Sequence, residues 1–292
     1  MRHRPAFSVL DLGLLLVVAG LVGWFGYTVV TGVDYNWDWG VIPQYMFRHD
    51  PERGWVPSLL MQGLLTTIRL SLWATVLATV LGTILGLCRV SRSLFNRLIG
   101  RTYVEFVRNI PPLVWVFVFY FFFSDQILPL VGAEDFVRSR PEGVQEFLAL
   151  VLAPPGRVAA FLSAVLTLAL YEASYITEII RSGIQSIERG QWEAAHALGL
   201  SPWQRMRHVI LPQAMRRVLP PMTGQFISTI KDSAIVSVIS IQELTFQGME
   251  LMAATYRTYE IWITITLLYL ALTLSLSLVA RKLELKLERS EA

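Results

Sequence analysis

Long apolar segments recur along this chain, and each is long enough to cross a lipid bilayer. A transmembrane helix needs about 20 predominantly apolar residues to cover about 30 Å of hydrocarbon. Of the 292 residues, 54% are hydrophobic and 16% are charged, whereas soluble domains carry about a quarter charged residues. The sequence therefore predicts an all-α polytopic membrane protein with about six transmembrane helices. The six segments are 9–30, 62–88, 110–131, 157–182, 218–241 and 259–280.

The distribution of Lys and Arg predicts how these segments are oriented. Six spans place both termini on the same side, and cytoplasmic loops are enriched in positive residues. One side holds 17 Lys and Arg residues and the other holds six. We therefore expect the N- and C-termini in the cytoplasm. The richer side comprises residues 1–8, 89–108, 181–217 and the tail from Arg281, and the poorer side comprises 31–61, 132–157 and 242–258.

The N-terminus has a basic start followed by an apolar stretch of about 22 residues. That stretch is long for a signal peptide and lacks an A-x-A cleavage pattern, so we expect it to remain as the first span. The net charge of +3 is too small to indicate a nucleic-acid partner. Cys88 is the single cysteine, and His196 and His208 have no third ligand nearby in the sequence, so neither an intrachain disulfide nor a metal site is expected.

A polar, basic segment lies between two apolar ones and reads EAAHALGLSPWQRMRHVILP over 193–212. Its first half predicts a helix over 191–198, because Gly199 stands where a left-handed C-terminal cap would fall. Ala194 and Ala195 would leave one face of this helix small enough for another protein to approach closely. This half of the segment therefore indicates a docking projection.

The second half of the same segment predicts a second short helix. Ser201-Pro202-Trp203-Gln204 forms a capping box with proline at the first helical position. The helix is expected to run to about Ile210 and to stop at Pro212. Helix, glycine turn and helix together form one compact, well-capped unit.

Three interpretations of this unit compete. It is a surface loop that happens to be well capped, a DNA-reading helix-turn-helix, or a docking site for a partner protein. Arg205, Arg207 and His208 imitate a DNA-reading helix, but such a module needs a supporting three-helix core. Here membrane spans lie on both sides of the unit instead, which argues against DNA.

The segment resembles the cytoplasmic EAA signature of ABC importer permeases, which is EAA, three residues, Gly, nine residues, Ile, any residue, Leu-Pro. Valine stands in the Ile position and keeps a β-branched apolar group. The segments 63–87, 103–121, 171–201 and 211–244 look like the polar amino acid permease family, which includes glutamine, glutamate, histidine and arginine importers, and the resemblance covers 60–282. The matching signature residues are Glu193, Ala194, Ala195, Gly199, Val209, Leu211 and Pro212.

The resemblance implies a type I ABC importer permease fold and a division of the chain. Residues 59–282 would form the importer transmembrane domain. Residues 1–58 would form an extra N-terminal helix and a periplasmic loop, and 283–292 a cytoplasmic tail. The chain would lie in a bacterial inner membrane as a multi-pass protein in contact with membrane lipid.

The resemblance also implies partners. In this family the EAA loop forms coupling helices that fit a groove on an ATPase subunit dimer. A second permease subunit, identical or paralogous, and a periplasmic amino-acid-binding protein complete the importer. The alternatives are an ATP-independent channel or secondary carrier, and a membrane scaffold that does not transport.

The sequence itself also indicates that another polypeptide supplies the energy for transport. A phosphate-binding P-loop needs Gly-Lys-Ser/Thr, and none of Lys231, Lys282 and Lys286 follows a glycine. No nucleophile stands at a credible spacing from a base. We therefore expect no catalytic residue and no cofactor in this chain, with ATP bound by the partner subunit.

Charged residues within or near the spans are the remaining candidates. Each charge costs at least about 2.5 kcal/mol at the centre of a bilayer unless it is paired or hydrated, so these residues should face the bundle interior. Glu178 and Arg181 would pair across one helical turn, and Lys231 and Asp232 would neutralise each other. In the competing interpretation, some of these residues line a translocation path and recognise a zwitterionic amino acid. The path candidates are Arg69, Glu178, Lys231 and Asp232, and Glu172 is a further intramembrane charge.

Overall fold

The computed structural model describes residues 8–32, 35–52, 54–127, 130 and 132–289. The chain divides into two compact units, Met1–Trp39 and Gly40–Ala292. The first contains α1, Val9–Gly32, a 24-residue helix that is apolar on all sides. A helix that is hydrophobic all round requires an apolar environment. Its length and composition are those of a membrane span, as the sequence predicts.

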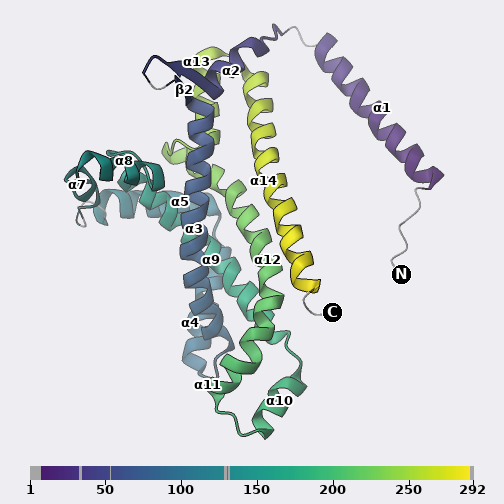
Figure 1. Cartoon of the computed structure of the whole chain (residues 1–292), viewed down its shortest axis with the longest axis vertical. Coiled ribbons are helices and arrows are strands. Elements are labelled where there is room, and N and C mark those ends of the chain that lie inside the picture. The colour runs from purple at the N-terminus through teal and green to yellow at the C-terminus, as the bar shows by residue number, and fades with distance from the viewer. Residues whose placement is uncertain (1–7, 33–34, 53, 128–129, 131, 290–292) are drawn as a thin grey trace. The chain divides into compact units, whose positions relative to one another are not determined.

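The second unit is built around two long helices, α3 (Leu59–Val90) and α9 (Val158–Gln185), which pack against each other over most of their length (Figure 1). Gly82 and Gly86 of α3 lie directly against α9. A Cβ added to either glycine would lie 2.7 Å from the Cβ of Ile176 or Ile180. Small residues allow such close approach, which membrane helices use because lipid supplies no hydrophobic force between them.

Two further long helices complete the bundle. They are α12 (Leu211–Asp232) and α14 (Thr258–Arg289), and α12 packs against α3, α9 and α14. The predicted span 218–241 is divided between α12 and the 3-10 helix η4 (Ser233–Ile239). α12 also carries Arg216, Arg217, Lys231 and Asp232. It therefore fails the criterion of length and apolar composition that marks a helix able to cross a membrane.

Among the described residues, four helices meet that criterion, or five when one bent pair counts as a single span. The bent pair is α4 (Leu94–Arg108) and the helix after it, α5 (Pro112–Phe119), which continues as the π-helix η2 (Tyr120–Ile127). The two halves meet at 102°. Pro111 causes the break, because proline disfavours helical backbone in the residue before it. The predicted span 110–131 is therefore only part of a broken helix.

The amphipathic pattern of residues 91–110 predicts a helix lying on the inner membrane surface, and α4 in fact packs one face against α3 and α9 while most of its side chains stay exposed. In the structure Gly100 contacts Leu85 and Arg89 of α3, and the Tyr103 hydroxyl donates to the Leu170 carbonyl at 2.5 Å. α4 thus lies along α3 and α9 and presents only its outer face to the surroundings.

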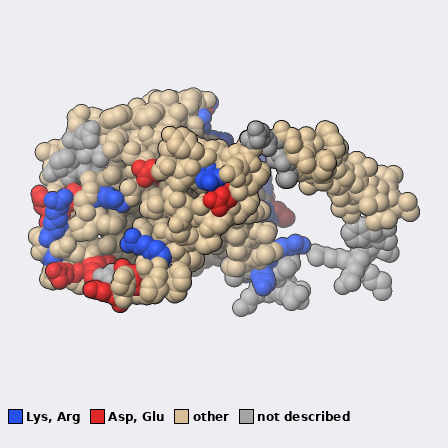
Figure 2. Space-filling model, turned by 90° about the horizontal axis from the view of Figure 1, so that it is seen from above, with Lys and Arg blue, Asp and Glu red and all other residues tan. Residues whose placement is uncertain are grey.

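Short elements lie at the two ends and at one side of the bundle (Figure 1). One end carries η1 (Trp39–Val41), α2 (Ile42–Met46), α13 (Leu244–Thr255) and an antiparallel hairpin of β1 (Phe47–Asp50) and β2 (Gly54–Pro57), in which Phe47 pairs with Pro57 and Asp50 with Gly54. The opposite end carries α10 (Arg189–Ala197) and α11 (Pro202–Arg205). At one side lie α7 (Ala133–Arg138) and α8 (Glu142–Val151). Seen from the α2 and α13 end, the surface is mostly uncharged and charged side chains gather mainly over the α7 and α8 side (Figure 2).

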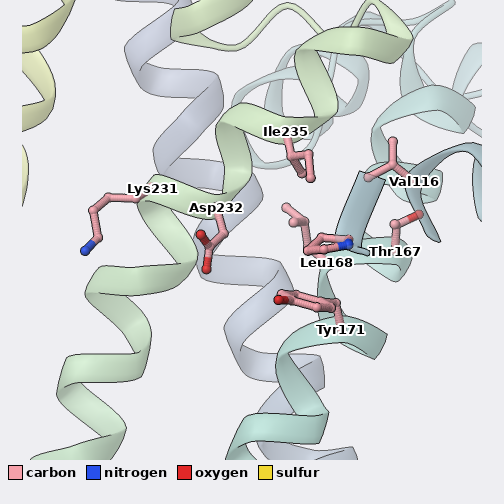
Figure 3. Close-up of a pocket in the computed structure, with 8 residues that line it drawn as sticks. Val116, Thr167, Leu168, Tyr171, Lys231, Asp232 and Ile235 are labelled. Atoms are coloured by element: carbon pink, nitrogen blue, oxygen red, sulfur yellow. The ribbon is translucent and has the colours of Figure 1, made fainter. Parts of the chain in front are cut away.

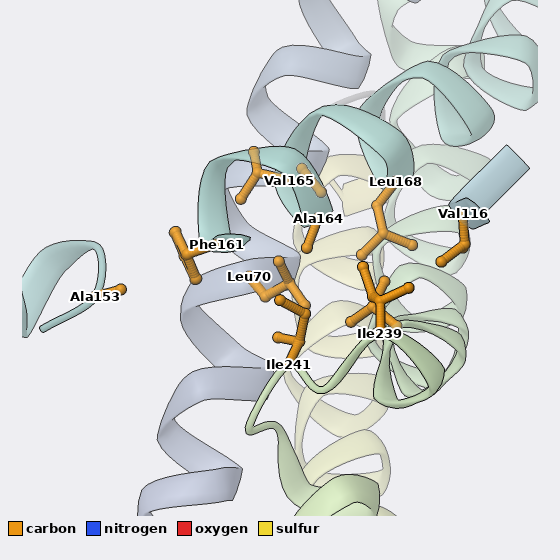
Figure 4. Close-up of a cluster of buried hydrophobic side chains, with 11 residues drawn as sticks. Leu70, Val116, Ala153, Phe161, Ala164, Val165, Leu168, Ile239 and Ile241 are labelled. Carbon is orange, nitrogen blue, oxygen red and sulfur yellow. The ribbon is translucent and has the colours of Figure 1, made fainter. Parts of the chain in front are cut away.

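Three buried apolar clusters of the described residues join these elements, and one of them links α2, α3, α13 and α14. The other two bear on the candidate site. The first lies where α3, α5, α9 and η4 meet, and it includes Leu70, Val116 and Leu168 (Figure 4). The second runs along α9 and α12 to the α10 and α11 end, and includes Ile184 and Ile210. The second cluster ties the polar end of the bundle to its membrane helices.

Candidate functional site

The first half of the polar segment is a short helix with a complete C-terminal cap. α10 ends at Ala197 and Gly199 takes a left-handed backbone conformation with φ of +74°. The Gly199 amide donates to the His196 carbonyl at 3.0 Å, and the Leu200 amide donates to the Ala195 carbonyl at 3.3 Å. These two bonds form a Schellman motif, which confirms the predicted glycine cap.

The second half starts with the predicted capping box. The Ser201 hydroxyl accepts from the Gln204 amide at 3.3 Å, and the Gln204 side chain accepts from the Ser201 amide at 2.9 Å. Two amides that would otherwise lack partners at the start of α11 are thereby satisfied. The cap is local, so its formation depends little on the rest of the fold.

The prediction that this helix stops at Pro212 is wrong. The chain continues from α11 through a π-helical turn, η3 (Met206–Ile210), directly into α12. Proline lacks an amide hydrogen, but it is tolerated in the first turn of a helix. The wider turn accommodates it, because the Leu211 amide donates five residues back, to Met206. The second short helix is therefore an extension of α12.

The inner face of the segment is anchored in the protein. Ala195 is 2% exposed and Ile210 is fully buried in the second cluster. The side-chain Nε2 of Gln213 in α12 donates to the side-chain oxygen of Gln191 in α10 at 3.2 Å. The Arg217 guanidinium donates to the Ser186 carbonyl at the end of α9. α9, α10 and α12 are thus joined by apolar packing and by two polar contacts.

The outer face is open and partly apolar. Leu198 is 79% exposed and Trp203 is 66% exposed. Glu193 pairs with Arg189 at 3.1 Å across one turn of α10, and both side chains are mostly exposed. Ala194 is exposed whereas Ala195 faces the protein's own core, so the face expected from both alanines contains only Ala194. Large exposed apolar side chains on a rigid projection are typical of a protein-docking surface.

Glu178 lies among three arginines of three helices. It forms an ion pair with Arg89 of α3 at 3.1 Å, and its other oxygen accepts from Arg181 Nε at 2.8 Å. Arg108 of α4 lies over the Tyr175 ring, 4.7 Å from its centroid. The predicted pairing of Glu178 with Arg181 is therefore present, and Arg89 adds a link between α3 and α9.

Asp232 lies at a small cavity of about 160 Å³ between α9, α5 and the end of α12. Figure 3 shows the side chains of Asp232 and Lys231 leaving α12 in different directions, with Lys231 directed away from Tyr171. Asp232 and Lys231 do not form an ion pair in the described part of the chain. Adjacent residues on a helix point in different directions, so the two side chains make no direct ion pair, although the Lys231 charge still acts electrostatically on Asp232.

A second carboxyl group lies behind Asp232. Glu172 is fully buried, accepts from the Gln225 side chain, and is close enough to Asp232 to interact with it. Its Oε1 atom has no hydrogen-bond partner among the described residues. Two adjacent carboxyl groups in a buried setting repel each other when both are ionised, so a cationic group beside them would be stabilised.

Arg69 lies apart from the other path candidates. Its guanidinium donates to the Ala149 carbonyl at 2.5 Å and to the Leu150 carbonyl at 3.3 Å. One turn further along α3, the Trp73 indole donates to the Val151 carbonyl at 3.0 Å. These bonds satisfy the last carbonyls of α8. Arg69 therefore attaches the α7 and α8 side of the molecule to α3, and neither Arg69 nor Glu178 lines the cavity at Asp232.

Several residues of these sites carry no sequence signal. Arg89, Arg108 and Gln225 come from helices distant in sequence from their partners. Glu243 is fully buried, and it accepts from the Thr245 and Phe246 amides and from the Tyr269 hydroxyl. Its position before the first turn of α13 is a weak signal, because glutamate is not among the preferred N-cap residues.

Comparison with known proteins places this geometry in context. Residues 56–289 match the family described as binding-protein-dependent transport system inner membrane component. The chain is 32% identical over 255 residues to the glutamate/aspartate import permease protein GltJ of Escherichia coli (strain K12), covering 87% of this chain and 96% of that protein. It is 34% identical over 229 residues to the glutamine transport system permease protein GlnP of the same organism, covering 77% and 93%.

Solved structures give the same result. A crystal structure of an amino acid ABC transporter with histidines matches with a TM-score of 0.65 and 30% identity, covering 86% of this chain and all of that one. An inward-facing structure of the MetNI methionine ABC transporter matches with a TM-score of 0.58 at 19% identity, covering 78% and 96%. The second likeness concerns the fold alone.

Proposed function

We propose, since the chain belongs to the family of binding-protein-dependent transport system inner membrane components, that it is the permease subunit of an ABC importer for polar amino acids. It would form the translocation path across a bacterial inner membrane. The relatives named for glutamate, aspartate and glutamine import support this substrate class. The signature residues from Glu193 to Pro212 would receive a partner ATPase.

The observation that carries the proposal is the mechanical link between the α10 and α11 segment and the membrane helices. Its two caps make the segment internally rigid. Its inner face is packed against α9 and α12, and the contacts of Gln213 and Arg217 reinforce that packing. A force applied at Leu198 and Trp203 would therefore move the ends of α9 and α12 together. Such rigid-body motion is how importers alternate access between two sides.

The cavity at Asp232 lies between the two helices that this motion would displace. We place the translocation path there. The carboxylates of Asp232 and Glu172 would attract the ammonium group of an amino acid, and Lys231 lies nearby on another face of α12. Arg69 and Glu178 would support the path from outside, because they hold α8, α3 and α9 in place.

The remaining parts of the proposal concern orientation and partners. The excess of Lys and Arg at the α10 and α11 end supports a cytoplasmic location for that end and for both termini. ATP would be bound by a separate ATPase dimer, so this chain needs no cofactor and performs no catalysis. A second permease, identical or paralogous, and a periplasmic amino-acid-binding protein would complete the assembly. Residues 1–58 would be an addition to the importer domain 59–282, with 283–292 as a tail.

A matched pair of variants tests the coupling role. Gly199→Arg forces a bulky residue into a left-handed turn, whereas Gly190→Arg adds the same charge in open space at the start of the same helix. In proteoliposomes with the ATPase and the binding protein, Gly199→Arg should abolish ATP-dependent uptake of a polar amino acid while Gly190→Arg retains most of it. Equal uptake by both variants would contradict the proposal. Uptake driven by an ion gradient without ATP would instead favour the alternative, a secondary carrier or channel.

A further inference from the structure

A second, larger cavity of about 410 Å³ lies on another side of the bundle. Its walls come from α3, the end of α8, the loop before α9, the start of α9, the loop after η4, and α13. Most of the lining is apolar, and two arginines, Arg69 and Arg157, contribute to it. The apolar side chains include Leu65, Ile68, Leu150, Leu152, Phe161 and Ile241.

Neither arginine forms an ion pair with a described residue of the chain. Arg69 donates to carbonyl oxygens of α8 and α3 and to the Thr66 hydroxyl at 3.0 Å, and Arg157 donates to the Gln242 side chain. Neither has a carboxylate within 4 Å in the described part of the chain, and no Asp or Glu lines the cavity. Arg69 is partly buried, where a charge next to apolar walls is costly unless an anion accompanies it, whereas Arg157 is exposed and open to a ligand.

The position of Arg69 on α3 indicates where such an anion comes from. Leu65, Leu72 and Val76 lie one or two turns from Arg69 on the same side of the helix, and all three are exposed apolar residues. An exposed apolar stripe on a membrane helix offers a surface that acyl chains cover favourably. Phe147 of α8 is also exposed. The cavity therefore adjoins a surface that fits acyl chains, and its cations fit a phosphate group.

We propose that this cavity binds the phosphate of an anionic phospholipid through Arg69 and Arg157, with its acyl chains along the exposed face of α3. The bound lipid would fill the space between α3 and α8 and so fix the α7 and α8 side of the molecule to the bundle. The inference depends on the chain lying in a membrane and on no detail of the transport mechanism.

Native mass spectrometry of the full-length chain released from nanodiscs tests the proposal. The nanodiscs contain phosphatidylglycerol and phosphatidylcholine, and the lipids retained by the wild type and by Arg157→Gln are compared. The control is Arg140→Gln, which removes the same charge from an exposed residue that lies over the Phe136 ring and outside the cavity. Arg157→Gln should lower retention of one phosphatidylglycerol per chain about fivefold, since one basic residue contributes about that factor near a lipid surface.

Arg69→Gln should show the same loss, but it also removes the cap of α8. If Arg69→Gln does not fold, Arg157→Gln alone still tests the proposal. Equal phosphatidylglycerol retention by wild type and Arg157→Gln would overturn the proposal. Retention of inorganic phosphate or of glutamate in place of phosphatidylglycerol by the wild type, lost in Arg157→Gln, would identify a site for free anions or for substrate and would also overturn the proposal. Neither outcome depends on whether transport is coupled to ATP.

Discussion

The α10 and α11 segment and the α3 and α9 pair are held together in opposite ways. The segment owes its shape to bonds between residues at most five positions apart, which close its two caps. The helix pair owes its shape to residues about 94 positions apart, where Gly82 and Gly86 meet Ile176 and Ile180. The first is an exposed polar structure, and the second is a buried and largely apolar one.

This difference separates two tasks. Local caps keep a small projection rigid even where nothing covers it, so it can receive a partner without losing its shape. Close apolar contact supplies most of the packing between α3 and α9, and the ion pair of Arg89 with Glu178 adds one directional link between them. The segment would receive the force and the bundle would respond to it.

The largest expected effect concerns the helix pair. Gly86→Ala places a methyl group 2.7 Å from the Ile180 Cβ, whereas Gly224→Ala on α12 places the same group in open space. Both changes improve helix propensity equally, so the contrast isolates packing. Overpacking costs about 1–3 kcal/mol, and Gly86→Ala should lower the Tm of the detergent-purified protein while Gly224→Ala leaves it equal or higher. Similar Tm values would show that α3 and α9 are less tightly packed than described.

A smaller effect is expected from the link between α3 and α9 at Glu178. Glu178→Gln removes the anion between Arg89 and Arg181, leaving their guanidinium groups close together. The side chains are partly exposed, so the loss of unfolding free energy should be about 1–2 kcal/mol, below that of a fully buried pair. The exposed pair Arg101 and Glu105 is the control, since Glu105→Gln should cost less than about 1 kcal/mol. Equal denaturation midpoints for the two variants would show that Glu178 does not stabilise the helix bundle.

The smallest effect on stability should come from the caps. Gly199→Ala requires a left-handed alanine and costs about 1–2 kcal/mol locally, whereas Gly190→Ala on the same helix has no such strain. Hydrogen exchange of the α10 amides should accelerate in Gly199→Ala alone, with the global Tm nearly unchanged. Acceleration throughout α9 and α12 would contradict the local character of the cap, as would no acceleration anywhere.

The same contrast explains what the sequence could predict. The cap at Gly199 and the capping box at Ser201 are written within a few residues, so their geometry follows from the sequence. The apolar spans follow from composition, although α12 and its arginines depart from that pattern. The continuation of the helix through Pro212 depends on a π-helical turn, and no residue pattern near Pro212 predicts that turn.

The partners of the charged residues in the membrane helices do not follow from the sequence, because they are distant along the chain. The partners of Glu178 include Arg89, which is 89 positions away, and Arg69 binds the end of α8, 80 positions away. No periodicity reveals which helices lie side by side. The free-energy cost of an unpaired charge within the membrane predicts that such residues have partners. Only the fold shows which residues those partners are.

Association with the ATPase tests the central claim most directly. Trp203→Asp places a charge on the outer face of the segment, and Trp55→Asp makes the same change at an exposed tryptophan of β2, at the opposite end of the bundle. The quantity measured is the amount of ATPase that co-purifies with each full-length variant, together with its ATP hydrolysis rate. Trp203→Asp should lose at least about tenfold in bound ATPase, the effect of truncating a typical aromatic contact residue, and Trp55→Asp should bind as the wild type does. Undiminished binding and hydrolysis with Trp203→Asp would contradict the claim that this segment receives the force.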